Sequence, residues 1–139
     1  MMTRRKGFTL MEIILVVVII GMLAVIVMQN MDGVINKARV SKAKSELASL
    51  HAALKRYEAE ATAYPTTAEG LTALVEKPAS WPEDVTWQRL LDRRSVPKDP
   101  WKQDYVYRCP GTLNPDSYDL LCAGPDRAED TDDDIDITE

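Results

Sequence analysis

The first apolar stretch of the chain is long and almost free of charge. From Phe8 to Met28 there are 21 residues, and Glu12 is the only charged one. About 20 apolar residues cross the hydrocarbon core of a bilayer as a helix. The pattern therefore predicts a membrane-spanning helix over residues 8–29, which contains a single carboxylate.

The helix is expected to continue beyond this stretch, with its apolar residues confined to one face. Residues 31–61 contain no proline and one glycine, and apolar side chains recur at Leu47, Leu50, Leu54 and Tyr57. This spacing places them on one face of a helix. We therefore expect one helix of roughly 50 residues, about 75 Å long at 1.5 Å per residue, whose second half carries a small domain on its apolar stripe. The residue before Pro65 is disfavoured in a helix and should close it.

The remaining chain predicts small, mixed elements. Thr66 and Glu69 have the spacing of a capping box, which predicts a short helix over 66–75. Two strands are expected at 105–108 and 118–121, separated by the turn residues of 111–116. The expected fold class is α+β, with the long N-terminal helix packed against a small antiparallel β-sheet.

Charge excludes some partners and orients the chain. The precursor has a net charge of −5, with 17 basic and 22 acidic side chains, so it lacks the basic face that nucleic-acid binding needs. Arg4, Arg5 and Lys6 precede the apolar stretch, and the positive-inside rule places that end in the cytoplasm. A carboxylate within the membrane costs about 2.5–3.5 kcal/mol, so Glu12 should have a cationic partner.

The N-terminal motif resembles that of a known class. The basic leader, Gly7 and the run Phe8-Thr9-Leu10-Met11-Glu12 are similar to the class III signal of type IV pilins and type II secretion pseudopilins. The resemblance implies cleavage between Gly7 and Phe8 by a prepilin peptidase, methylation of Phe8, and pairing of Glu12 with the Phe8 amine of a neighbouring subunit. The implied parts are a leader at 1–7, a transmembrane and filament-core helix at 8–29, and a periplasmic head at 30–139. The alternative is a plain signal anchor with Glu12 at the membrane surface.

Three further motifs narrow the family to the major pseudopilins of type II secretion systems. Their segments are 64–71 (YPTTAEGL), 97–105 (PKDPWKQDY) and 118–126 (YDLLCAGPD). The family often has glycine where this chain has Lys102, Arg127 and Asp130, and serine at Cys122. The resemblance implies a structural, non-enzymatic subunit that polymerises in the periplasm and pushes folded substrates through the outer-membrane channel. Its implied partners are copies of itself, the minor pseudopilins and the inner-membrane platform.

The acidic C-terminal segment is the candidate metal site. The resemblance implies one calcium ion bound by Asp126, Asp133 and Asp134, with the carbonyls of Leu121 and Ala123 as further donors. An EF-hand is excluded, because the positions that it would require to be Gly and Glu hold Thr131 and Ile137. The alternative is a solvated acidic tail.

The two cysteines leave two alternatives open. Cys109 and Cys122 have a spacing that suits neighbouring strands, and the oxidising periplasm permits a disulfide. The other alternative is two unpaired buried thiols.

Rival functions are a type IV pilin, a minor pseudopilin or a membrane-anchored calcium-dependent binding module. No nucleophile motif or phosphate-binding loop indicates an enzyme.

Overall fold

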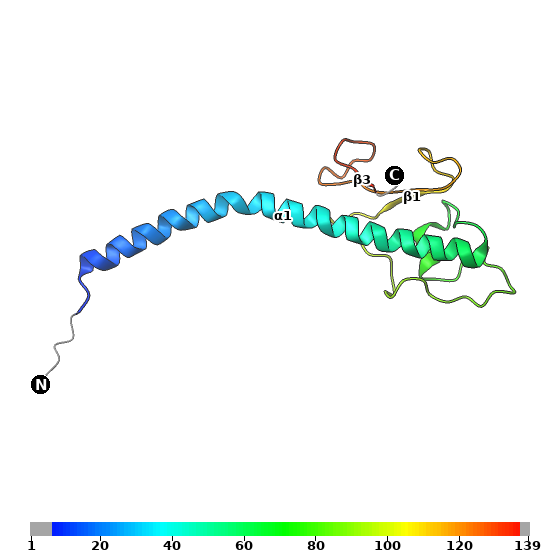
Figure 1. Cartoon of the computed structure of the whole chain (residues 1–139), viewed down its shortest axis with the longest axis horizontal. Coiled ribbons are helices and arrows are strands. Elements are labelled where there is room, and N and C mark those ends of the chain that lie inside the picture. The colour runs from blue at the N-terminus through cyan, green and yellow to red at the C-terminus, as the bar shows by residue number, and fades with distance from the viewer. Residues whose placement is uncertain (1–6, 137–139) are drawn as a thin grey trace, which may run out of the picture. The chain divides into compact units, whose positions relative to one another are not determined.

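One long helix and a small sheet make up the regular structure. The computed structural model describes residues 7–136, without the side chains of 29–32. Helix α1 spans Leu10–Ala61, a total of 52 residues, and runs unbroken through Gln29 (Figure 1). The chain divides into two compact units, which we call the N-terminal unit (Met1–Lys37) and the head unit (Ala38–Glu139). The unit boundary thus lies within α1, eight residues after the expected boundary at 29/30.

Helix α1 ends at Ala61, slightly ahead of Tyr64. Thr62 adopts a left-handed conformation with φ of 63°, and its N–H donates to the carbonyl of Glu58 at 2.7 Å. A left-handed residue just after the last turn is a common helix terminator, because its amide satisfies a carbonyl at the helix end. Pro65 then prevents the helix from resuming.

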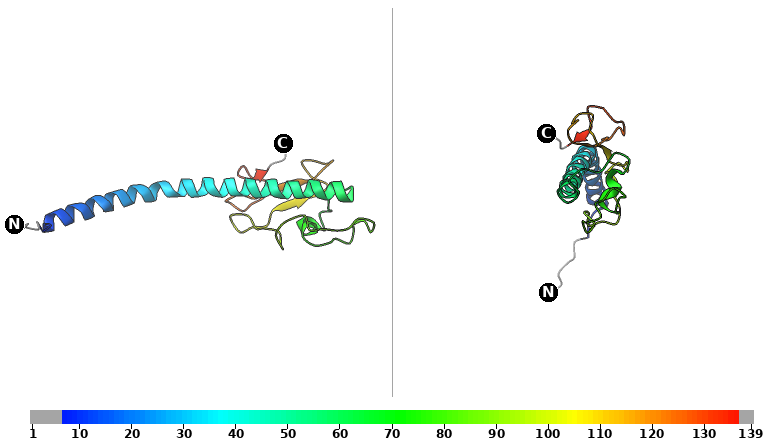
Figure 2. Two further views of the ribbon diagram at one scale, coloured as in Figure 1. Left: turned by 60° about the horizontal axis from the view of Figure 1, so that its bottom comes forward. Right: turned by 90° about the vertical axis from the view of Figure 1, so that its right-hand side faces the viewer.

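The head unit is built on the apolar stripe of α1, as the sequence predicts. Leu47, Leu50, Leu54 and Tyr57 are each at most 2% exposed and belong to one core cluster. The sheet supplies the opposite wall through its buried aromatic and aliphatic side chains. Figure 2 shows the strands beside the C-terminal half of α1 in both views. Burial of each such side chain contributes about 1.5–3 kcal/mol.

The sheet has three antiparallel strands in the order β1-β2-β3. Strand β1 is Val106–Arg108, β2 is Asp119–Cys122 and β3 is Ile135–Asp136. The first two confirm the predicted strands to within one residue. Strand β3 was not expected, because it lies in the acidic segment and its only strand signal is Ile135, which is 7% exposed.

The segment after α1 forms a shorter helix than the sequence predicts. A turn over 67–69 leads into the 3₁₀ helix η1, Gly70–Leu74. The Thr66–Glu69 box is present: Thr66 N–H donates to Glu69 Oε2 at 2.9 Å, and Glu69 N–H donates to Thr66 Oγ1 at 3.3 Å. Gly70 has φ of 58°, which ends regular α-helical winding at this point.

The disulfide alternative is wrong in this structure. Both cysteines are free, with Cys122 buried and Cys109 half-buried. In the β1–β2 register Arg108 pairs with Asp119 and Val106 with Leu121, so the two cysteines lie at opposite ends of the ladder. Four residues of strand separate them by about 13 Å, whereas a disulfide needs Cα atoms within about 7 Å.

Candidate assembly and metal-binding sites

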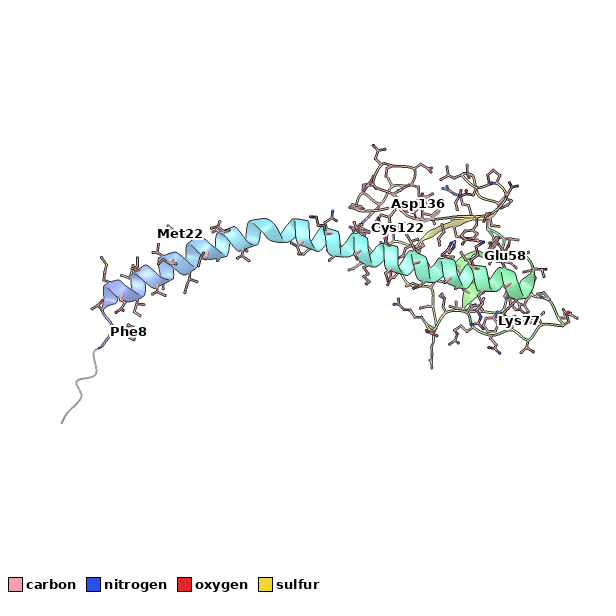
Figure 3. The ribbon with its side chains drawn as sticks, viewed as in Figure 1. Phe8, Met22, Glu58, Lys77, Cys122 and Asp136 are labelled. Carbon is pink, nitrogen blue, oxygen red and sulfur yellow. The ribbon has the colours of Figure 1, made fainter. Side chains whose placement is uncertain are left out.

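Among the residues that the structure describes, none covers the apolar half of α1. From Phe8 to Met28 seventeen large apolar side chains are exposed, including Phe8 at 79% and Met22 at 65%; both are labelled in Figure 3. Helix α1 is apolar enough to cross a membrane, with a mean hydropathy of 3.1 over its most apolar 18-residue window, and none of that window is buried. By length and composition, this segment is long and apolar enough to cross a membrane.

Thr9 begins the helix and also organises the backbone at Glu12. The N–H of Glu12 donates to the Thr9 hydroxyl at 3.2 Å and to the Thr9 carbonyl at 3.1 Å. A threonine at this position satisfies an amide that has no partner within the helix. A carboxylate in the first turn also interacts favourably with the helix dipole. The Thr9-x-x-Glu12 spacing is itself a capping signal that the sequence contains.

The acidic loop between β2 and β3 joins two of the three predicted ligand residues through a backbone hydrogen bond. Asp133 Oδ2 accepts from the N–H of Asp126 at 3.3 Å. Asp133 Oδ1 accepts from the hydroxyl of Thr131 at 2.8 Å. That hydroxyl bond, aided by the Asp126 N–H, holds the pKa of Asp133 below its usual value. Asp133 is thus held as a carboxylate in a loop that already directs donors at it.

The third carboxylate, Asp134, lies beside this pair. Its Oδ2 accepts from the N–H of Asp130 at 2.8 Å. The next residue, Ile135, pairs with Cys122 in the sheet, and Leu121 and Ala123 flank Cys122 on the other strand. All five predicted ligand residues therefore lie at one end of the β2–β3 pair. Within residues 7–136, however, no three acidic, histidine or cysteine side chains form a group that could hold a metal ion.

Gly124 gives this loop its close approach to the strand end. It has φ of 65°, and a Cβ placed there would overlap the Asp133 carbonyl oxygen and lie 3.0 Å from its Oδ2. Only glycine permits Asp133 to approach the backbone this closely at a positive φ. Arg108 of β1 also pairs with Glu129, which ties the loop to the sheet. Figure 3 labels Cys122 and Asp136, which mark this end of the sheet.

Three positions where this chain departs from glycine adopt the conformation that glycine favours. Lys102, Arg127 and Asp130 have φ of 71°, 62° and 64°. A non-glycine residue in this region costs about 1–2 kcal/mol. The chain therefore holds non-glycine residues in a backbone conformation that favours glycine at these turns, at a cost in stability.

Two carboxylates of the head unit are buried, Asp99 and Asp119, and each accepts hydrogen bonds from nearby backbone N–H groups. Asp99 is 4% exposed; its Oδ1 accepts from the N–H groups of Trp101 and Gln103, and its Oδ2 accepts from the Cys122 thiol at 3.2 Å. Burial, with Asp99 nearby, raises the pKa of Cys122 to about 12. The thiol therefore remains protonated and acts as a hydrogen-bond donor, the role that a serine hydroxyl would fill.

Comparisons with known proteins agree with this arrangement over nearly the whole chain. Residues 2–28 match the prokaryotic N-terminal methylation motif, and residues 30–139 match type II secretion system (T2SS), protein G. The chain is 43% identical over 132 residues to the type II secretion system core protein G of Escherichia coli K12, covering 95% of this chain and 90% of that one. It is 41% identical to the protein of the same name from Pseudomonas aeruginosa, covering 95% and 94%.

A solved structure shows the same fold. The crystal structure of the major pseudopilin from the type 2 secretion system of enterohaemorrhagic E. coli is similar with a TM-score of 0.61 and 38% identity, covering 76% of this chain and 91% of that one. An apolar N-terminal helix with the methylation motif, whose second half carries a three-stranded sheet, defines a type IV pilin-like subunit. Within that class the chain belongs to the type II secretion system protein G family, the major pseudopilins. Members of this family are structural subunits.

Proposed function

We propose that this chain is anchored in the inner membrane by α1 and then polymerises into a periplasmic pseudopilus. The observation that carries the proposal is the uncovered apolar surface of residues 8–28. Seventeen large apolar side chains at about 1.5 kcal/mol or more each amount to tens of kcal/mol. Lipid covers this surface before assembly, and the same surface of neighbouring copies covers it in the filament.

Glu12 links processing to polymerisation in this proposal. Cleavage after Gly7 creates an ammonium group at Phe8, which is then methylated. A carboxylate buried among apolar helices is costly alone but much less so beside an opposite charge. The amine of Phe8 on one subunit therefore pairs with Glu12 on its neighbour, and each added subunit satisfies one carboxylate.

The membrane topology and the other partners in this proposal are those that the resemblance to the family implies. The head lies in the periplasm and the leader in the cytoplasm, where a prepilin peptidase removes it. The leader residues 1–6 lie outside the described residues. Minor pseudopilins and the inner-membrane platform are the other partners, and growth of the filament pushes folded substrates through the outer-membrane channel.

The Glu12→Gln variant tests this mechanism, because it keeps the shape and removes the charge. We expect at least a tenfold loss of both sheared filaments and secreted substrate, while membrane insertion is unchanged. Glu76→Gln is the matched control, since Glu76 is an exposed residue of the head unit. Mass measurement of the mature chain should show a terminus at Phe8 with one added methyl group. Normal filament formation by Glu12→Gln, or an unprocessed terminus, contradicts the proposal.

We further infer that the β2–β3 loop binds one calcium ion. The donor chemistry fits: calcium takes carboxylate and backbone carbonyl oxygens, and the loop holds the backbone of Asp126 against the Asp133 carboxylate, with Asp134 next in the chain. The carbonyls of Leu121 and Ala123 would complete the ligands. When bound, the ion neutralises the mutual repulsion of these carboxylates and stabilises the folded loop.

Calcium removal gives a direct measurement. Urea unfolding of the full chain in detergent, followed by tryptophan fluorescence, should show a lower midpoint in EDTA than in calcium. The expected difference is about 2.7 kcal/mol when calcium is at 100 times its dissociation constant. Asp126→Asn and Asp133→Asn should abolish the response, whereas Asp92→Asn, outside the loop, should retain it. Equal midpoints in calcium and EDTA contradict calcium binding.

A further inference from the structure

Cys122 lies at the end of β2 that leads into the candidate calcium loop. It is 0% exposed and is labelled in Figure 3. Its backbone pairs with Ile135 of β3, which directly follows the predicted ligand Asp134. Its chain neighbours Leu121 and Ala123 are the two predicted carbonyl donors. Whatever fixes Cys122 therefore also fixes the backbone that carries the proposed calcium ligands.

The side chain that fixes Cys122 is the carboxylate of Asp99, which comes from a different part of the chain. Asp99 is 4% exposed, and its Oδ2 accepts from the Cys122 thiol at 3.2 Å. Its Oδ1 accepts from the N–H groups of Trp101 at 2.9 Å and Gln103 at 2.7 Å. The N–H of Asp99 in turn donates to the Gln103 carbonyl at 2.9 Å. The position of this acceptor is therefore set within its own turn.

The sulfur of Cys122 also faces the acidic loop. The N–H of Gly124 acts on it and opposes the rise in the thiol pKa that burial causes. Gly124 has φ of 65°, and a Cβ placed there would lie 3.0 Å from Asp133 Oδ2. The backbone of Gly124 thus lies directly against a predicted ligand. A continuous path of contacts runs from Asp99 through the Cys122 sulfur and the Gly124 backbone to Asp133.

We propose that Asp99 and Cys122 are positioning residues for the calcium site, with the thiol as the link between the turn at 97–104 and the β2–β3 loop. The proposal rests on the proposed calcium binding, and neither residue is a ligand in it. Groups that hold metal ligands in place typically change metal affinity 10–100-fold when they are removed. A serine hydroxyl can replace the thiol, because it also donates one hydrogen bond and accepts others.

Calcium titration of two Cys122 variants tests this role. Isothermal titration calorimetry of the full chain in detergent, with calcium added after EDTA treatment and dialysis, gives the dissociation constant. We expect Cys122→Ala to raise this constant about tenfold or more, and Cys122→Ser to leave it within about threefold of the unmodified chain. An unchanged constant in Cys122→Ala, or an equally large rise in Cys122→Ser, overturns the proposal.

Tyr107→Phe is the matched control for a loss of stability that leaves the calcium loop in place. The Tyr107 hydroxyl donates to the Pro65 carbonyl at 2.7 Å. Its removal leaves a buried acceptor without a donor, as Cys122→Ala does for Asp99. We expect a lower urea midpoint in both variants, but a raised calcium dissociation constant only in Cys122→Ala. An equal rise in Tyr107→Phe overturns the proposal, because it assigns the effect to stability alone.

A double-mutant cycle tests whether Asp99 acts through the thiol. Asp99→Asn keeps one oxygen for the amides of Trp101 and Gln103, while its NH₂ group faces the thiol, which then has no acceptor. We expect Asp99→Asn to weaken calcium binding about tenfold, with no further loss when it is combined with Cys122→Ala, because both changes break one path. Losses that multiply overturn the thiol as the link.

The unmodified chain separates failure of this proposal from failure of the calcium site. If it binds calcium and the variants bind equally well, only the positioning role is overturned. If it binds no calcium in the titration, the calcium site of the proposed function is contradicted, and the positioning role is overturned with it.

Discussion

The strongest single prediction concerns Asp119, whose carboxylate organises the β1–β2 turn. Asp119→Asn replaces one of its two oxygens by an NH₂ group. Each oxygen accepts two bonds, Oδ2 from Thr112 and Leu113 and Oδ1 from the backbone and side chain of Asn114. Whichever way the amide is turned, its NH₂ group faces two N–H donors and both bonds are lost.

The size of the effect follows from these bonds. A hydrogen bond to a charged group contributes about 1.5–3 kcal/mol, so the loss of two lowers the free energy of unfolding by about 3–6 kcal/mol. That is a large part of a total of about 5–15 kcal/mol. With a urea dependence of about 2 kcal/mol per molar, the midpoint falls by about 2 M.

The pH dependence supplies a second readout. Burial opposes ionisation of Asp119, but the amides of Leu113, Thr112 and Asn114 outweigh it, and its pKa lies below the usual value. The charged form therefore contributes stability above the unfolded pKa of about 3.9, and this contribution is lost as the pH falls through the lower folded pKa. From pH 5 toward pH 3, the midpoint should fall more steeply in the unmodified chain than in Asp119→Asn.

The assay is urea unfolding of the full chain in detergent, followed by tryptophan fluorescence, since all three tryptophans lie in the head unit. Asp116→Asn is the matched control: the residue is exposed in the same turn, and its replacement should change stability by less than about 0.5 kcal/mol. Equal midpoints for Asp119→Asn and Asp116→Asn would refute the reasoning.

Three further predictions concern the head unit. Lys102→Gly and Arg127→Gly should each raise the free energy of unfolding by about 0.5–1 kcal/mol. Glycine removes the steric cost of the left-handed backbone, but it also increases the conformational entropy of the unfolded chain, which offsets part of the gain. Unchanged or lower urea midpoints would contradict this. Cys122→Ser should lower the free energy of unfolding by less than about 1 kcal/mol. Cys122→Ala should lower it by about 1–3 kcal/mol, because a buried oxygen of Asp99 then has no donor. Iodoacetamide labelling read by mass spectrometry should modify Cys109 well before Cys122, whose pKa is raised to about 12 by burial; equal rates would contradict this.

Much of the fold and of the N-terminal site could be predicted from sequence, because the signals are local. Helical periodicity placed Leu47, Leu50, Leu54 and Tyr57 in the core, and all four are buried there. The N-terminal motif is contiguous, and its match to the methylation family confirms it. The predicted capping box at Thr66 also formed, although the helix that it opens is a shorter 3₁₀ turn.

Features that join distant residues could not be read from the chain. The cysteine spacing suited a disulfide, but the strand register placed the two thiols at opposite ends of the ladder. Strand β3 is two residues long within an acidic run, and it forms because its backbone groups complete the edge of β2. Asp119 has no local signal for its role either, since its donors lie five to seven residues away across a turn.

The sequence by itself determined a long apolar helix, its amphipathic continuation and the family, because periodicity and contiguous motifs depend only on near neighbours. Tertiary structure alone decided the strand register, the free state of the cysteines and the carboxylates that hold the turns. Those features depend on which backbone groups remain unpaired after the core has packed, and a buried polar group must then find its partner wherever the fold places one.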